Sequence, residues 1–247
     1  MVSNLSQSYN KSFFEQMEAG ARDSAGVVLP VVTELLGTRS VIDVGCGRGA
    51  WLRAALDLGI QDVLGMDGDY VLSQGLLIPR ERFQPTDLSR PFATPMGYEL
   101  ALCLEVAEHL PRRSAASLVA TLTSAAPVVL FSAAIPGQPG THHINEQFPW
   151  FWHSLFALHN YVALDVVRPL IRDNVRVEPW YAQNILLYVA REYYEGSPQL
   201  REYRPLETQA ELLPWVYGGI WQGRVNWRGP LSVLRVVLKR ALASWLH

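Results

Sequence analysis

Two carboxylates and an imidazole stand close together in the segment 105–109 of this 247-residue sequence. Glu105, Glu108 and His109 occupy positions i, i+3 and i+4, so a helical turn would place their side chains on one face. Converging carboxylates and an imidazole are suitable ligands for a hard or borderline divalent cation. A further ligand would have to come from another part of the chain.

The loop 136–148 contains the adjacent residues His142 and His143. We favour His143 as the functional one, because it lies nearer to a helix predicted to begin at Asn145, which would cap that helix. Glu146 would then lie in the first helical turn and stabilise the helix dipole. His143 is either a metal ligand or, without a metal, a general base, and the sequence leaves both open.

A second candidate site is the segment 41–49, in which Gly45, Gly47 and Gly49 alternate directly after an apolar run. Glycines permit positive φ and let a ligand lie against bare backbone. A dinucleotide-binding loop has the spacing G-x-G-x-x-G and places a pyrophosphate on the helix N-terminus. The spacing here is G-x-G-x-G, and the carboxylate of Asp43 would repel a pyrophosphate. It suits a cation, and S-adenosylmethionine carries an ammonium and a sulfonium but no phosphate.

Short apolar runs alternate with helical patterns along the first 190 residues. This alternation predicts an α/β fold: a Rossmann-like, seven-stranded, mostly parallel sheet with helices on both faces. Ligands of such sheets bind at the carboxyl ends of the strands. The predicted strands are 40–44, 63–66, a short one around Phe83, 100–104, 128–133, 161–167 and 185–189, and the predicted helices include 51–58, 112–124 and 145–158.

The segment 43–49 resembles motif I of the class I S-adenosylmethionine-dependent methyltransferases. Asp67 ends the second predicted strand, where this family places an acid on the ribose hydroxyls, and Asp87 follows the third, at the adenine-contacting position. The segment 105–109 resembles the motif after the family's fourth strand. The resemblance covers about residues 35–190 and implies these cofactor-binding residues: Asp43, Gly45, Cys46, Gly47, Gly49, Asp67, Gly68, Asp87, Leu88 and Glu105.

Glu-x-x-Glu-His with a distant histidine is similar to the arrangement in small-RNA 2′-O-methyltransferases and, more loosely, in ubiquinone-pathway O-methyltransferases. In those enzymes a magnesium or manganese ion binds the acceptor hydroxyl, favours its alkoxide and aligns it with the methyl group. The resemblance implies the metal ligands Glu105, Glu108, His109 and His143, of which Glu105, His109 and His143 are also the catalytic candidates.

The second half of the chain is expected to bind the acceptor. Seven of the eight tryptophans lie between Trp150 and Trp245, and aromatic faces stack on sugars and planar substrates. We expect a methyltransferase domain over 1–190, with a lid helix at about 9–36, and a C-terminal appendage over 191–247. The amphipathic pattern of 231–247 suggests docking on the domain or a homodimer contact. The candidate acceptor-binding residues are His142, Glu146, Trp150, Trp180 and Tyr181.

The formal net charge of −2 argues against a protein that binds nucleic acid through its phosphates. Two cysteines are too few for a disulfide framework, and the N-terminus lacks a secretory signal, so we expect a cytoplasmic protein. The uncharged stretch 114–135 is long enough to span a bilayer, but its small polar residues and Pro127 favour a helix followed by a buried strand.

These observations favour a methyltransferase that uses S-adenosylmethionine and, with or without the help of Mg²⁺ or Mn²⁺, methylates a hydroxyl of a small molecule such as a sugar or another vicinal diol. A small-molecule N-methyltransferase without a metal, a non-catalytic cofactor-binding subunit and a nicotinamide oxidoreductase remain as alternatives.

Overall fold

Seven strands form a single sheet in the computed structural model, which describes residues 11–208. They are β1 (Ser40–Val44), β2 (Asp62–Asp67), β3 (Phe83–Pro85), β4 (Leu100–Leu104), β5 (Val128–Ser132), β6 (Tyr161–Leu164) and β7 (Leu186–Ala190). Their order is β3-β2-β1-β4-β5-β7-β6. The strands from β3 to β5 are parallel, and β7 is antiparallel to both of its neighbours. The carboxyl ends of β1, β2, β4 and β5 therefore meet at one edge of the sheet.

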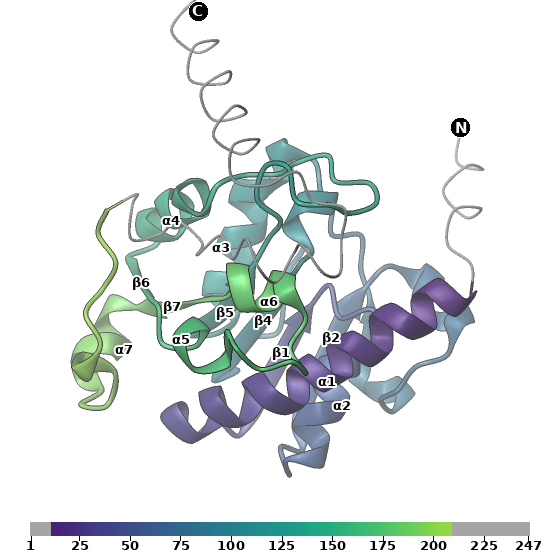
Figure 1. Ribbon diagram of the computed structural model, residues 1–247, viewed down its shortest axis with the longest axis horizontal. Coiled ribbons are helices and arrows are strands. Elements are labelled where there is room, and N and C mark those ends of the chain that lie inside the picture. Colours follow the sequence, from purple (N-terminus) through teal and green to yellow (C-terminus); the bar gives the residue numbers. More distant parts are fainter. Residues whose placement is uncertain (1–10, 209–247) are drawn as a thin grey trace, which may run out of the picture.

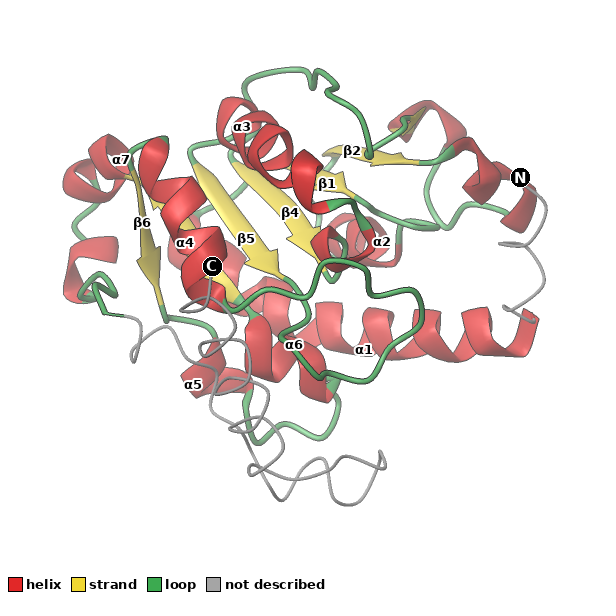
Figure 2. Ribbon diagram, turned by 90° about the horizontal axis from the view of Figure 1, so that it is seen from above, coloured by secondary structure: helices red, strands yellow, loops and turns green. Residues whose placement is uncertain are grey.

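Helices cover both faces of this sheet, as Figures 1 and 2 show. Buried apolar side chains form one cluster beneath each helical layer. One layer contains α1 (Lys11–Leu36), α2 (Ala50–Asp57), α5 (Arg168–Ile171) and α6 (Pro179–Asn184), the other contains α3 (Ala115–Ala125) and α4 (Pro149–Leu158), and α7 (Arg191–Gly196) follows β7. Short 3₁₀ turns lie at Asp69–Gln74, Arg80–Arg82, Ala107–His109, Arg112–Ser114 and Leu200–Glu202.

The predicted fold class is confirmed, including all seven strands. The uncharged stretch 114–135 forms α3 and β5, and no helix within residues 11–208 is long and apolar enough to cross a bilayer. Residues after the predicted boundary at 190 pack on the sheet domain: Leu200 is fully buried in the core, and the Leu206 N–H bonds to the Ala163 carbonyl. The boundary itself stays a prediction. The predicted helix 231–247 lies outside the described residues.

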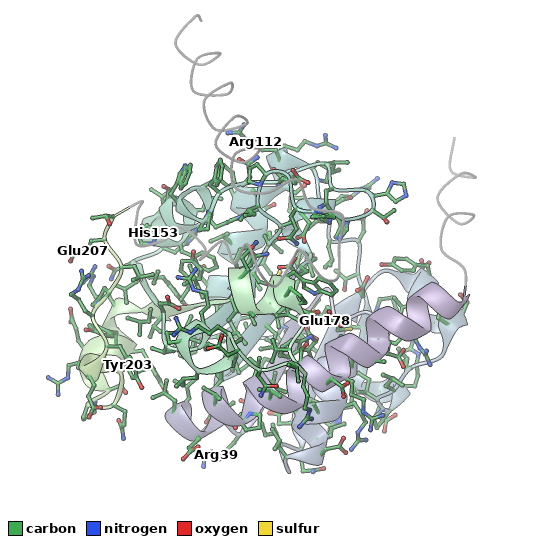
Figure 3. The ribbon with its side chains drawn as sticks, in the orientation of Figure 1. Arg39, Arg112, His153, Glu178, Tyr203 and Glu207 are labelled. Atoms are coloured by element: carbon green, nitrogen blue, oxygen red, sulfur yellow. The ribbon has the colours of Figure 1, made fainter. Side chains whose placement is uncertain are left out.

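Helix α1, which corresponds to the predicted lid helix at 9–36, contacts both halves of the sheet domain. Glu18 forms an ion pair with Arg48 of the glycine loop, at 2.7 Å. Two residues further along, Gly20 leaves room for the Glu178 side chain at the start of α6, where a Cβ would collide with it. The Glu178 N–H also bonds to the Ser24 hydroxyl, at 2.9 Å. Figure 3 shows Glu178 beside α1. This helix therefore links the loop after β1 to the connection between β6 and β7.

The glycine loop 45–49 needs glycine for two reasons. Gly45, Gly47 and Gly49 all have positive φ, which L side chains rarely adopt. Gly45 also lies against the Val106 side chain, which follows β4, so that a Cβ on Gly45 would overlap with it. The loop after β1 and the turn after β4 can approach each other only because no side chain separates them.

Replacing Gly45 by alanine tests this close approach. Gly45→Ala adds the strain of a positive φ and the collision with Val106, and we expect it to lower the free energy of unfolding by about 3 kcal/mol. Gly37 is the matched control, because it has a φ of 65° and a Cβ placed on it would have no neighbouring atom within 4 Å. Gly37→Ala should cost only about 1 kcal/mol. Equal losses in urea denaturation would contradict the close-contact argument.

Candidate functional site

The Asp67 carboxylate fastens the glycine loop to the end of β2. One of its oxygens accepts a hydrogen bond from the Gly47 N–H at 2.7 Å. The other accepts from the Gly68 N–H and the Tyr70 hydroxyl, both at 2.7 Å. Gly68 leaves the space that the Tyr70 ring occupies. The predicted cofactor residues Gly45, Gly47, Gly49, Asp67 and Gly68 are thus brought together at one place.

Asp43 lies at the centre of the same edge and is only 2% exposed. Its Oδ2 is buried and has no hydrogen-bond partner among the described residues. Burial, and to a lesser extent the charge of Asp67, raise the pKa of Asp43 to about 8. A buried carboxylate oxygen without a partner is costly, and a cationic group placed beside it would compensate that cost.

The remaining predicted cofactor residues are Cys46, Leu88 and Asp87, and their contact with a cofactor stays a prediction. Cys46 is buried, and its sulfur packs against Gly65 of β2, while burial raises the pKa of its thiol. Leu88 is buried in the core. Asp87 is exposed, and its carboxylate accepts hydrogen bonds from the Ser89 N–H and hydroxyl and pairs with Arg90. Asp87 therefore lies beyond β3 as predicted, and its contact with an adenine stays a prediction.

The turn after β4 differs from the predicted helical turn. Glu105 has a φ of 55°, in the left-handed region, and only Ala107–His109 form a 3₁₀ turn. The Glu105 carboxylate lies beside that of Glu108, but its partners include two side-chain amides. Its two carboxylate oxygens accept hydrogen bonds from the Gln138 amide at 2.7 Å and the Asn184 amide at 3.1 Å. The prediction of one helical turn through Glu105, Glu108 and His109 is wrong, although the side chains of Glu105 and Glu108 do lie together.

Three of the four predicted metal ligands do converge. Within the described residues, one possible ligand atom from each of Glu108, His109 and His143 lies within 4.8 Å of the others. His109 and His143 have ring centroids 5.1 Å apart in a T-shaped arrangement. The loop after β5 is fastened to this turn by its backbone: the N–H groups of Ile144 and Asn145 both bond to the Glu108 carbonyl.

The loop also orients His143. The His143 Nδ1 lies 3.3 Å from the Glu146 carboxylate, whose other oxygen accepts a hydrogen bond from the Gly137 N–H at 2.8 Å. Its ring packs directly on Gly140, where a Cβ would collide with it. With Nδ1–H donated to Glu146, the lone pair of Nε2 is available to a metal or a proton.

The predicted capping roles of Asn145 and Glu146 are wrong. Helix α4 begins at Pro149, not at Asn145, because proline suits the first helical position and holds the preceding Phe148 in an extended conformation. The Asn145 amide instead bonds to the Ala107 carbonyl, at 3.2 Å. Both residues therefore hold the loop in place rather than start a helix.

The electrostatics of this cluster favour a cation. Both carboxylate oxygens of Glu108 are buried without a hydrogen-bond partner among residues 11–208. Burial, followed by the charge of Glu105, raises the pKa of Glu108 well above its ordinary value, and burial also raises that of Glu105. Desolvation and the neighbouring His143 lower the pKa of His109, so its imidazole is neutral and able to bind a metal.

The predicted acceptor residues lie in different elements of the structure. His142 is exposed, with a φ of 58°. Trp150 is half-buried and stacks on Phe148, with ring centroids 4.3 Å apart. Tyr181 is buried in α6 against Trp51, with centroids 5.2 Å apart, and its neighbour Trp180 is half-buried. The contact of these residues with an acceptor stays a prediction.

Sequence reasoning missed Gln138 and Asn184. Both are buried, and their amides form a network with each other, with Gln183 and with Glu105. A buried glutamine in a glycine- and proline-rich loop carries no spacing signal that links it to a residue 46 positions away. Gln183 lies in the same network, of which Glu105 is the member that the sequence analysis had named.

No protein-family model and no curated protein sequence matches the chain. Solved structures do. The methyltransferase domain of bacterial CtHen1-C is 17% identical with a TM-score of 0.52, and the match covers 68% of this chain and 98% of that one. A SAM-dependent methyltransferase from Archaeoglobus fulgidus is 14% identical with a TM-score of 0.51, over 73% and 99% of the two chains. The chain therefore has the class I methyltransferase fold.

Removing the Glu108 charge tests the buried carboxylate pair. Because the native pKa of Glu108 is raised, the metal-free protein loses stability as the pH rises from the ordinary glutamate pKa through the native one. In the presence of a chelator at pH 8, we therefore expect Glu108→Gln to raise the free energy of unfolding, measured by urea denaturation, by about 1 kcal/mol relative to wild type. This gain should shrink towards pH 5. The exposed Glu195→Gln is the control and should differ from wild type by less than about 0.5 kcal/mol at either pH.

Proposed function

We propose that this protein is an S-adenosylmethionine-dependent methyltransferase that methylates a hydroxyl of a small molecule with adjacent hydroxyl groups, using a divalent metal ion. The observation that carries the proposal is the convergence of Glu108, His109 and His143 at the same sheet edge as the glycine loop and Asp43. One part of this edge is suited to a cationic cofactor and the other to a divalent cation.

The residues of the glycine loop fit the cofactor. S-Adenosylmethionine supplies a methyl group made electrophilic by its sulfonium. The buried Oδ2 of Asp43 is available to the cofactor's ammonium, and the glycines remove side chains from the surface on which the cofactor would lie. Asp67 holds the loop in shape through Gly47, and this pre-formed geometry reduces the cost of binding.

The donor set fits a divalent metal. The Glu108 carboxylate has no internal partner among the described residues, and His143 is oriented by Glu146 in the way that carboxylates commonly orient metal-bound histidines. Two imidazoles beside one carboxylate favour a transition-metal ion, of which Mn²⁺ is one, over Mg²⁺, which prefers oxygen ligands. When bound, such an ion would supply Lewis acidity towards the acceptor hydroxyl. Glu105, whose oxygens are taken by amides, is not part of the proposed ligand set.

The surroundings of the site support a small, uncharged acceptor. The net charge of −2 provides no general attraction for a polyanion. The stacked pair of Phe148 and Trp150 follows the loop that holds His143, and aromatic faces of this kind pack on sugar rings. A metal can bind two adjacent oxygens, which favours a vicinal diol over a single hydroxyl. Without a metal, His143 would accept the hydroxyl proton.

The metal site is tested by binding alone. Calorimetry with Mn²⁺ should detect one site per chain, and His143→Ala should weaken binding at least tenfold, because a ligand is lost. His159→Ala is the matched control, since His159 is exposed at the end of α4 and belongs to no ligand group among the described residues. Unchanged Mn²⁺ affinity in His143→Ala would remove the metal from the proposal.

Methyl transfer tests the activity itself. Radiolabelled S-adenosylmethionine should label sugars and other vicinal diols but not their monodeoxy analogues, EDTA should abolish labelling, and Mn²⁺ should restore it. Full activity in EDTA would favour His143 as a metal-free base. Labelling of amines alone would indicate an N-methyltransferase, labelling of RNA alone would overturn the small-molecule acceptor, and cofactor binding without any transfer would indicate a non-catalytic subunit.

A further inference from the structure

The hydroxyl group of Tyr70 lies on the carboxylate that fastens the glycine loop. It donates a hydrogen bond to the Oδ1 of Asp67, at 2.7 Å. Asp67 is only 8% exposed, whereas Tyr70, the donor, is 59% exposed. An exposed phenol that reaches a nearly buried carboxylate in this way shows that the carboxylate is open to a hydroxyl group from the solvent side.

The hydrogen bonds that Asp67 already accepts leave little capacity for a ligand. A carboxylate has about four lone-pair positions, two on each oxygen. The Gly68 N–H and the Tyr70 hydroxyl take both positions on Oδ1, and the Gly47 N–H takes one on Oδ2. Among residues 11–208, a single position therefore remains on this carboxylate, and it belongs to Oδ2.

The cofactor of the proposed function carries two adjacent hydroxyl groups on its ribose. Such a diol matches a carboxylate when each hydroxyl donates to a different oxygen, and hydrogen bonds to a charged acceptor are the strong ones. This arrangement needs one lone-pair position on Oδ1 and one on Oδ2. The diol can therefore bind both oxygens of Asp67 only if one of the present donors leaves Oδ1.

Of the two donors on Oδ1, Tyr70 is the one that can leave. The Gly68 N–H belongs to the backbone directly after β2, so it moves only with the strand. The Tyr70 side chain is exposed and can change its rotamer. The backbone of its 3₁₀ turn, Asp69–Gln74, is held separately, because the Val71 N–H bonds to the Gly68 carbonyl at 3.2 Å. Release of Tyr70 thus breaks one side-chain hydrogen bond and leaves the backbone unchanged.

We propose that Tyr70 competes with the ribose hydroxyl groups of the cofactor for Asp67, and that cofactor binding exchanges the phenol hydroxyl for the diol. Tyr70 is then an internal competitor that limits how tightly the cofactor is held, because only molecules in which it has left Asp67 bind the diol fully. This inference rests on the proposed function, because it assumes S-adenosylmethionine as the cofactor, but it does not depend on the metal.

Binding calorimetry with two ligands tests the proposal without any turnover. The ligands are S-adenosylhomocysteine and its 2′,3′-dideoxy analogue, which lacks the diol. Tyr70→Phe removes only the competing hydroxyl, so it should bind S-adenosylhomocysteine about ten times more tightly than wild type, because a hydrogen bond to a charged group no longer has to be broken. The dideoxy analogue leaves Tyr70 on Asp67, and its affinity should change less than about twofold. The ratio of the two affinities is measured within each protein, so a small loss of stability in the variant does not affect it.

Tyr193→Phe is the matched control, since it removes the hydroxyl of an exposed tyrosine in α7 and should leave both affinities within about twofold of wild type. Equal gains for both ligands in Tyr70→Phe would overturn the proposal, because the hydroxyl would then hinder binding without competing with the diol. An unchanged or weaker affinity for S-adenosylhomocysteine would overturn it as well and leave Tyr70 as a support of Asp67. A wild-type protein that binds neither ligand would instead refute the proposed function, and the inference with it.

Discussion

Buried acidic groups at the carboxyl edge of one parallel sheet are the constraint on which the rest of the structure depends. Charged groups in a protein interior need partners, and this chain supplies them to some carboxylates and not to others. Asp67 is satisfied by backbone N–H groups and the Tyr70 hydroxyl, and Glu105 by two side-chain amides. Asp43 and Glu108 keep oxygens without partners in the part of the chain that the structure describes. Asp67 and Glu105 stabilise the loops through their hydrogen bonds. Asp43 and Glu108 lie at the two places that are suited to a positively charged ligand.

Contacts between the loops at this edge of the sheet bring the surroundings of Asp43 and Glu108 into one site. Backbone hydrogen bonds from Ile144 and Asn145 to the Glu108 carbonyl bring the loop after β5 onto the turn after β4. The close contact between Gly45 and Val106 brings that turn against the glycine loop. Helix α1 then extends across the same face, paired with the glycine loop through Glu18 and packed on α6 through Gly20. We therefore expect a substitution in the glycine loop to affect the turn after β4 and the loop after β5 as well.

The fold and the position of the site were largely predictable from the sequence. Buried parallel strands read as short apolar runs, and the glycines and acids that follow them must gather where the strands end. The details of the turns were less predictable. Glu105 was assigned to a helical turn, but its left-handed backbone directs the carboxylate to Gln138 and Asn184. The start of α4 was placed four residues too early, although Pro149 was a signal for the correct position.

The sequence by itself determined the sheet, the glycine loop with its acid, and the types of side chain available to bind a metal. These are local properties, because periodicity and motif spacing act over a few residues. Only the tertiary structure decided which of the candidates meet. It selected His143 over the exposed His142 for the cluster, gave the Glu105 carboxylate two amide partners, and left the Asp43 Oδ2 without a partner among the described residues. Partnership between distant polar groups depends on how packed segments approach one another, and no local pattern records it.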